Sequence, residues 1–166
     1  AGGRASILIQ LARHLTQLRV VATASRPHTR QWCLELGAHI VIDHSRPLTE
    51  GLRAAAVGGV DMVASLTQTA MHYPQIIEAL RPQGQLAVID DMPMLDAMPL
   101  KGKSLSLHWE MMFARSRFQT PDMIEQHRLL NTVAEWLDAG KLRGTLKEKL
   151  SPINGANLRK AHERVE

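Results

Sequence analysis

The stretch Gly2-Gly-Arg-Ala-Ser6, followed by Ile7-Leu-Ile-Gln-Leu-Ala-Arg-His-Leu15, decides how the rest of the chain is interpreted. Two adjacent glycines permit a tight turn and let other groups approach the backbone closely. The segment that follows is apolar on nearly all sides, as expected of a helix buried against a sheet. A glycine turn that leads into such a helix is typical of the first crossover of an α/β fold.

Outward from this turn, short β-branched runs alternate with helical patterns. Strands are predicted at residues 19–23, 39–42, 60–64 and 85–89, and helices at residues 28–36, 48–56 and 71–80. This alternation, with its short turns, predicts an α/β fold with a doubly wound parallel sheet and helices on both faces. Beyond it we expect a loop at 92–100, a strand at 103–109, a helix from Thr120 to about Gly140, and a last helix from Asn154.

The chain is predicted to form one domain over residues 1–166, because no linker, repeat or low-complexity tract divides it. In folds of this type a strand precedes the glycine turn, and none stands before Ala1. The sequence also ends inside a predicted helix, at Glu166. We therefore expect a truncated domain that lacks its first and last strands.

Composition argues against several classes of protein. Hydrophobic residues make up 45% of the chain and charged residues 22%, which is typical of globular domains. No apolar run reaches the roughly 18 residues of a transmembrane helix. The single cysteine, Cys33, cannot form an internal disulfide or hold a structural zinc alone, so we expect no metal here and a cytoplasmic location. The net charge is +4, but the basic residues are scattered without interleaved aromatics, which disfavours nucleic acid as a partner.

A series of motifs extends along the whole chain in a fixed order. It comprises Ala1-Gly-Gly-Arg-Ala-Ser6, Ala22-Thr-Ala-Ser-Arg-Pro27, Leu36-Gly-Ala38, Val41-Ile-Asp-His44, Gly59-Val-Asp61, Leu80-Arg-Pro-Gln-Gly84, Ile89-Asp-Asp91, Leu107-His-Trp-Glu110 and Phe118-Gln-Thr-Pro-Asp-Met-Ile-Glu-Gln-His127. Together they resemble the zinc-type alcohol dehydrogenase-like proteins of the quinone oxidoreductase branch, in the medium-chain dehydrogenase/reductase superfamily. The resemblance implies a Rossmann-type domain that binds a nicotinamide dinucleotide. It also implies an N-terminal GroES-like catalytic domain, which is absent from this sequence.

The glycine turn is the first predicted cofactor contact. Gly2 and Gly3 let the backbone approach a pyrophosphate, and the helix start supplies free N–H groups and a positive dipole end. The family has Val where Arg4 stands and Gly where Ala5 stands. Arg4 either pairs with a phosphate or faces solvent without a specific role.

The end of the strand predicted at residues 19–23 indicates which dinucleotide is bound. Rossmann domains specific for NAD place Asp or Glu about 20 residues after the glycines, where it binds the ribose 2′-OH. This chain has Ser25 and Arg26 there, with no carboxylate to repel a 2′-phosphate. Both can donate hydrogen bonds to phosphate, so the sequence predicts NADPH (NADP) over NADH. Alternatively, both residues cap the next helix; His28 and Arg30 lie nearby.

The remaining candidates follow the later strands, because parallel strands place their carboxyl ends along one ligand crevice. By resemblance, the turn with Ser65 and Thr67 lies beside the cofactor ribose and nicotinamide, unless it is an ordinary polar turn. Ile89 and Asp90 are expected to contact the nicotinamide, through backbone groups as much as side chains. His44 either contacts the adenine or is an ordinary surface histidine. No residue is assigned a catalytic role.

A cluster of aromatic and Met residues lies at positions 108–113. Three interpretations of this cluster are open. It can form the wall of an apolar substrate pocket, an interface with another chain, or part of the hydrophobic core. The resemblance implies a homodimer that pairs through the edge strand from about Ser104 to His108. The predicted function is the cofactor-binding portion of an NADPH-dependent oxidoreductase that transfers hydride to a carbonyl, quinone or enone, with no turnover by this chain alone. The alternative is a non-catalytic dinucleotide-binding module.

Overall fold

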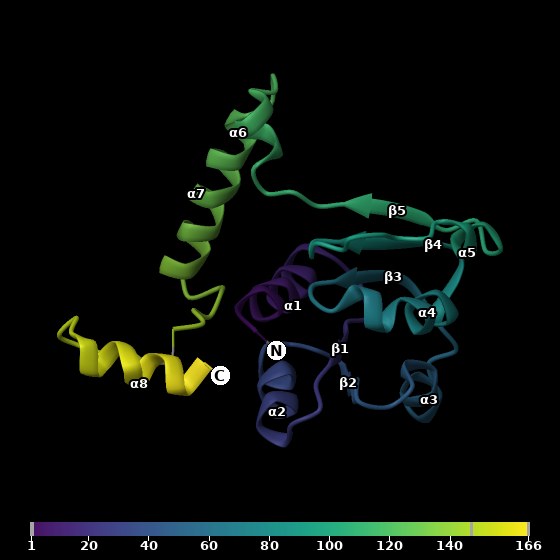
Figure 1. Ribbon diagram of the computed structural model, residues 1–166, viewed down its shortest axis with the longest axis horizontal. Coiled ribbons are helices and arrows are strands. Elements are labelled where there is room, and N and C mark those ends of the chain that lie inside the picture. The colour runs from purple at the N-terminus through teal and green to yellow at the C-terminus, as the bar shows by residue number, and fades with distance from the viewer. Residues whose placement is uncertain (1, 147, 166) are drawn as a thin grey trace.

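The computed structural model describes residues 2–146 and 148–165, so that Ala1, Lys147 and Glu166 lie outside the described residues (Figure 1). Helices and strands alternate along the first two thirds of the chain. The elements are α1 (Gly3–Leu15), β1 (Val21–Thr23), α2 (Pro27–Glu35), β2 (Ile40–Ile42), α3 (Leu48–Ala54), β3 (Val60–Ser65), α4 (Thr69–Ala79), β4 (Leu80–Val88), α5 (Met98–Lys101), β5 (Ser106–Trp109), α6 (Ala114–Phe118), α7 (Ile124–Asp138) and α8 (Gly155–Val165). The predicted α/β class is confirmed.

The described strands form two parallel sheets. β1 pairs with β2, with Val21 opposite Ile40 and Thr23 opposite Ile42. β3, β4 and β5 form the second sheet in that order. Because every pair is parallel, the carboxyl ends of the strands in each sheet lie along one edge. In the described part of the chain, the outer strands β1, β2, β3 and β5 each have one side without a strand partner.

Helices cover both faces of the first sheet, and a shared core joins it to the second sheet. α1 and α2 pack on one face around the buried side chains of Ile9 and Cys33. On the opposite face, Ile42 of β2 packs with Leu52 of α3. Val60 at the start of β3 joins this second cluster, so the core under α3 and α4 is continuous from one sheet to the other.

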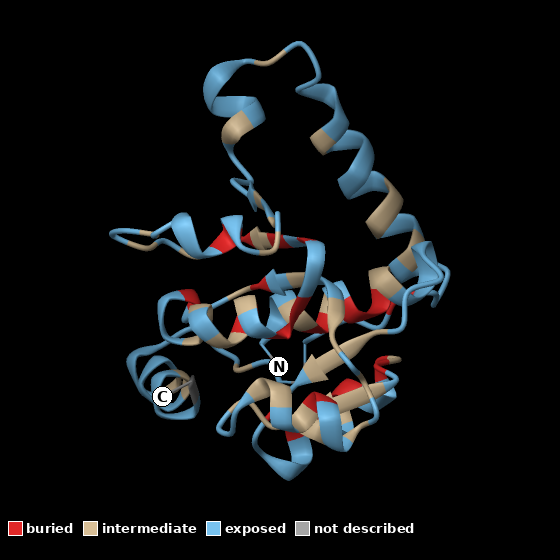
Figure 2. Cartoon of the chain, turned by 90° about the vertical axis from the view of Figure 1, so that its right-hand side faces the viewer, coloured by how far each residue is buried: buried red, intermediate tan, exposed pale blue. Residues whose placement is uncertain are grey.

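The second sheet is covered by α4 on one face and is exposed on the other. Leu86 of β4 is fully buried and packs with Ile76 of α4. Side chains on the opposite face, including Met62, Ala64 and His108, are exposed. Figure 2 shows that buried residues concentrate where helices lie against the sheets.

Several element bounds differ from the expected ones for local reasons. β5 begins at Ser106 and not at residue 103, because Ser104 has a φ of 52° and breaks the extended run. β4 begins at Leu80, because Val60 pairs with Leu80 and Met62 pairs with Gln85, and the register shift between these pairs takes in Gln83, which has a φ of 65°. α7 begins at Ile124, since a separate turn from Thr120 precedes it, closed by the Met123 N–H. The short helices α5 and α6 were not predicted.

Helices α6, α7 and α8 extend away from the two sheets (Figure 1). No residue of α7 is buried, and Ile124, Leu129 and Leu130 are at least half exposed. Among the described residues, no helix combines the length and apolar character needed to span a bilayer.

Candidate functional site

The carboxyl ends of neighbouring strands bring the predicted site residues together in pairs. Ser25 follows β1 and His44 follows β2, and these strands are hydrogen-bonded partners whose last paired residues are Thr23 and Ile42. Ser65 ends β3, and its carbonyl accepts the N–H of Ile89, which follows β4, at 3.2 Å. That these residues contact a cofactor stays a prediction.

The first turn of α1 leaves backbone donors free to bind an anion. The Gly2 carbonyl accepts the Ser6 N–H at 3.1 Å, and no side chain caps the helix. The N–H groups of Gly3, Arg4 and Ala5 therefore have no acceptor within the helix. A Cβ atom at Gly2 or Gly3 would have no neighbour within 4 Å, so packing among the described residues does not require glycine there. This open space fits the approach of a pyrophosphate.

The charge of Arg4, in the glycine turn, acts on Asp90 at the end of β4. Burial raises the pKa of the Asp90 carboxyl, but hydrogen bonds from Thr69 and from a backbone N–H, together with the Arg4 guanidinium, hold it below its ordinary value. Arg4 itself is exposed. The structure thus places the charge of one predicted cofactor residue within electrostatic range of another.

The carboxylate of Asp90 is engaged by the start of α4. The Thr69 N–H donates to Asp90 Oδ2 at 2.9 Å, and the Thr69 hydroxyl donates to Oδ1. Ser65 Oγ lies 2.6 Å from Thr69 Oγ1, and Thr69 is fully buried. Both carboxylate oxygens of Asp90 face α4. A nicotinamide at this position would therefore be contacted by backbone groups and not by the Asp90 side chain. Thr67, by contrast, is exposed.

Ser25 and Arg26 project from the carboxyl end of β1 into solvent. Both are exposed, although Ala24 before them is only 1% exposed. Arg26 stands at the N-cap position of α2, but no side chain makes a capping hydrogen bond there. In the described part of the chain, neither side chain takes part in a hydrogen bond or ion pair. Arg26 thus occupies the cap position without a side-chain capping bond, and that Ser25 and Arg26 bind a ligand stays a prediction.

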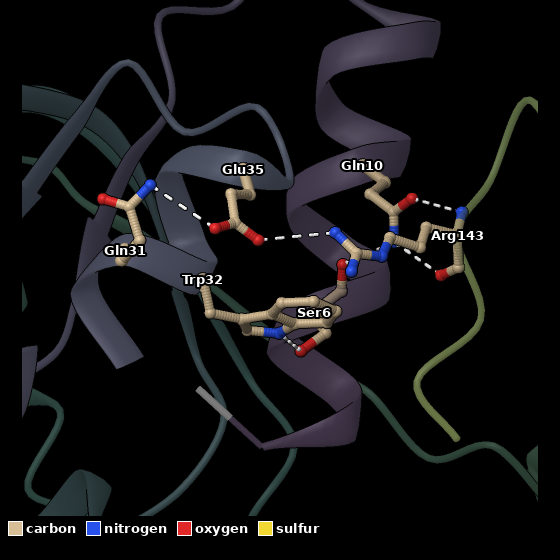
Figure 3. Close-up of polar contacts among 6 residues, drawn as sticks. All are labelled: Ser6, Gln10, Gln31, Trp32, Glu35 and Arg143. Atoms are coloured by element: carbon tan, nitrogen blue, oxygen red, sulfur yellow. Dashed lines mark hydrogen bonds and ion pairs between the residues drawn. The ribbon is translucent and has the colours of Figure 1, made fainter. Parts of the chain in front are cut away.

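A polar junction fixes the first turn of α1 against α2 and the segment after α7 (Figure 3). Trp32 Nε1 donates to Ser6 Oγ at 3.0 Å, and the Ser6 hydroxyl donates to the Gly2 carbonyl at 3.1 Å. The Arg143 guanidinium lies over the Trp32 ring, 4.5 Å from its centroid. Gln10 accepts the Arg143 N–H at 2.6 Å and donates to its carbonyl at 3.1 Å. No sequence motif marks this contact, so Trp32 was assigned no role beyond its helix.

An open hollow of about 640 Å³ lies beside this junction. It is lined by His28, Gln31, Trp32, Glu35, Arg143, Gly144 and Leu146. These residues come from α2 and the segment after α7 and not from the strand ends, and Arg143 already donates to Glu35 at 3.4 Å. We assign no ligand to the hollow.

His44 lies against a histidine that the sequence did not single out. The rings of His44 and His72 meet edge to face, with centroids 6.2 Å apart. The Nδ1 atoms of both are buried and have no hydrogen-bond partner among the described residues. Buried polar atoms normally have a partner, so these two nitrogens are exceptions among the described residues. The adenine contact of His44 stays a prediction.

The strand β5 and the segment after it present an exposed apolar surface. Among the described residues β5 pairs only with β4, and Trp109 is 56% exposed. Met111, Met112 and Phe113 are each more than half exposed. Core packing, one of the three interpretations of this cluster, is therefore wrong, and an interface or a pocket wall remains.

The described residues do not fit a zinc ion. They contain no group of three or more His, Cys, Asp or Glu side chains placed to bind a metal. Cys33 is fully buried in the core under α1 and α2, and burial raises the pKa of its thiol. We assign no zinc chemistry to this part of the chain.

Comparisons with known sequences match nearly the whole chain. The family model described as zinc-binding dehydrogenase matches residues 36–166. A zinc-type alcohol dehydrogenase-like protein of Staphylococcus aureus is 34% identical over 170 residues, which cover 100% of this chain and 50% of the relative. A zinc-type alcohol dehydrogenase-like protein of Staphylococcus epidermidis is 30% identical, over 100% of this chain and 49% of the relative. The chain thus spans about half the length of the curated relatives it matches.

Solved structures agree with these matches. A Rhizobium etli protein named for zinc-dependent alcohol dehydrogenase has 50% identity and a TM-score of 0.91, over 99% of this chain and 48% of that one. Escherichia coli quinone oxidoreductase, solved with NADPH, has 19% identity and a TM-score of 0.73, over 89% of this chain and 45% of that one. At this identity the match shows a shared fold alone. The resemblance expected from the motifs is confirmed: the chain belongs to the zinc-binding dehydrogenase family, and its domain is of the Rossmann type found in medium-chain dehydrogenases/reductases.

Proposed function

We propose that this chain is the cofactor-binding portion of an NADPH-dependent oxidoreductase that transfers hydride to a carbonyl, a quinone or an enone. The observation that carries the proposal is the free, exposed pair Ser25 and Arg26 at the carboxyl end of β1. The unpaired N–H groups at the start of α1 support a pyrophosphate site beside it. Belonging to a dehydrogenase family supports the reaction class.

The choice of NADPH follows from charge. A phosphate monoester carries about −1.5 to −2 charges at neutral pH, and an arginine fork can donate two hydrogen bonds to it. Arg26 makes no ion pair within the described residues, so no competing carboxylate has to be displaced first. A hydrogen bond to a charged group contributes about 1.5–3 kcal/mol, which corresponds to about ten- to a hundredfold in affinity.

The bound nicotinamide would supply the hydride, and this chain would bind and orient it. None of the described residues is assigned as a proton donor, because the Asp90 carboxylate is already engaged by Thr69. The acceptor class follows from the family resemblance. We therefore expect the 166-residue chain to bind NADPH without turnover by itself.

Titration with NADPH and NADH tests the cofactor. Arg26→Ala is expected to weaken NADPH binding about ten- to a hundredfold and to leave NADH binding nearly unchanged. Arg53→Ala, which removes an exposed arginine from α3, is the matched control. An equal loss for both dinucleotides, or no loss for either, would overturn the role of Arg26. Binding of S-adenosylmethionine in place of NADPH would reject the whole assignment.

Activity separates the two functional candidates. The complete gene product should oxidise NADPH in the presence of a quinone or an enone. Tight NADPH binding with no oxidation, across a panel of both acceptor classes, would favour the non-catalytic binding module.

We also propose a homodimer formed through β5, because this strand has an open edge and exposed side chains on it, including His108. Unpaired strand edges readily pair with a second copy. Ser106→Lys should shift the sedimentation of the protein from dimer to monomer. A wild-type protein that sediments as a monomer at all concentrations would contradict the dimer.

A further inference from the structure

Arg30, in the first turn of α2, connects the carboxyl ends of both strands of the first sheet. Its Nη2 donates to the Val41 carbonyl at 2.8 Å, and its Nη1 donates to the Ala24 carbonyl at 3.2 Å. The Ala24 N–H donates in turn to the Ile42 carbonyl at 2.9 Å. The guanidinium thus extends the β1–β2 connection beyond the paired residues, at the edge where cofactor contacts are predicted.

The same residue holds the other end of the segment that carries Ser25 and Arg26. The backbone N–H of Arg30 donates to the Arg26 carbonyl at 3.0 Å. Ser25 and Arg26 therefore lie between two anchors: the Arg30 side chain at Ala24 and the first backbone hydrogen bond of α2 at Arg26. Only the first anchor depends on the arginine side chain. Without it, two exposed residues whose side chains make no hydrogen bond or ion pair among the described residues would be held at one end alone.

We propose that Arg30 is a positioning residue, which fixes Ser25 and Arg26 for recognition of a 2′-phosphate and so sets the preference between NADPH and NADH. This inference rests on the proposed function. The planar fork of arginine can reach two carbonyls at once, whereas the ammonium group of lysine is a single point charge. Within the described residues Arg30 forms no ion pair with a carboxylate, so its charge also adds to the positive potential around Arg26.

Two variants separate the bridging hydrogen bonds from the charge. Arg30→Met removes both, and Arg30→Lys keeps the charge but cannot hold the two carbonyls in one plane. Both are expected to lower NADPH affinity about tenfold, the effect of one misplaced charged hydrogen bond, and to leave NADH affinity nearly unchanged. Arg53→Met is the matched control. Hydrogen exchange at the Ala24 amide, which donates to the Ile42 carbonyl, should be faster in both variants than in the wild type.

The outcomes are distinguishable from those that test the cofactor itself. A wild type that prefers NADPH, with Arg30 variants that keep its preference and its exchange rates, would overturn this inference alone. Full NADPH preference in Arg30→Lys, with a loss only in Arg30→Met, would mean that the charge acts without positioning, and would also overturn it. A wild type without preference would overturn the cofactor choice and this inference together. If Arg30→Met fails to fold, the Arg30→Lys measurements decide.

Discussion

Replacing Asp90 with alanine should lower the free energy of unfolding by about 1–4 kcal/mol. Thr69 is the first residue of α4, and no side chain from the N-cap position satisfies that helix start. Its N–H donates instead to Asp90 at 2.9 Å. Because Thr69 is fully buried, removal of the carboxylate leaves this donor unpaired, at a cost of about 1–3 kcal/mol. The lost negative charge at the helix N-terminus adds about 0.3–1 kcal/mol.

The same carboxylate should make stability depend on pH. Burial raises the pKa of Asp90, but the hydrogen bonds from Thr69 and from a backbone N–H, together with the Arg4 guanidinium, hold it below its ordinary value. A group with a lowered folded pKa stabilises the fold fully above its unfolded pKa and loses that effect as the pH falls through the folded value. In Asp90→Asn, the free energy of unfolding should therefore depend less on pH below about pH 4 than it does in the wild type.

Urea unfolding followed by circular dichroism measures these effects. Asp90→Ala, Thr69→Val and the double variant form a cycle whose coupling energy should exceed about 0.5 kcal/mol, since the two residues are in contact. Asp91→Ala, at the exposed neighbouring position, is the control. The free energy of unfolding of Asp90→Ala could instead lie within about 0.5 kcal/mol of the wild-type value, as for a surface substitution. In that case the assignment of Asp90 as the cap of α4 is wrong.

Three further predictions concern other parts of the chain. Lys103→Met should cost about 1–3 kcal/mol, because Lys103 Nζ donates to three carbonyls at the end of α4 at 2.7–2.8 Å; an equal loss in Lys101→Met would contradict this. Trp32→Phe should cost about 1 kcal/mol and speed hydrogen exchange at the Ser6 amide in the first turn of α1, because it removes the donor to Ser6; unchanged exchange would contradict it. Cys33 should react with a thiol reagent only after unfolding, because it is fully buried and burial raises the pKa of its thiol; a similar rate in the folded protein would contradict that.

The order of helices and strands was predictable because it is written in local patterns. The β-branched run at residues 39–42 and the apolar helix after Gly3 each need only their own neighbours to be recognised. Strand pairing was less accessible, because it depends on residues far apart in the sequence. The sequence predicted one sheet, whereas the described strands form two, joined by a core that includes Leu52 and Val60.

The candidate site divides in the same way. The place of Ser25 and Arg26 at the carboxyl end of β1 was predictable, because a short β-branched strand is recognised from its own residues. The contact of Asp90 with Thr69 was not, because the two residues are 21 positions apart and their direction is set by how α4 packs on the sheet. Arg30 was noticed only as a basic neighbour, since its contacts with two strand ends depend on β1 and β2 being paired.

The distribution of charge along the two sheet edges adds an argument for a dinucleotide. Arg26 and Arg30 give the carboxyl end of β1 two cations with no carboxylate paired to them in the described part of the chain. The end of β4 carries the exposed Asp91, whereas the carboxylate of the neighbouring Asp90 is engaged by Thr69. A ligand with phosphates at one end and an oxidised, cationic nicotinamide ring at the other would match this gradient. An anion that lacks such a ring would gain nothing from the acidic end, so NADP⁺ should bind more tightly than adenosine 2′,5′-bisphosphate, by a margin that shrinks in Asp91→Asn.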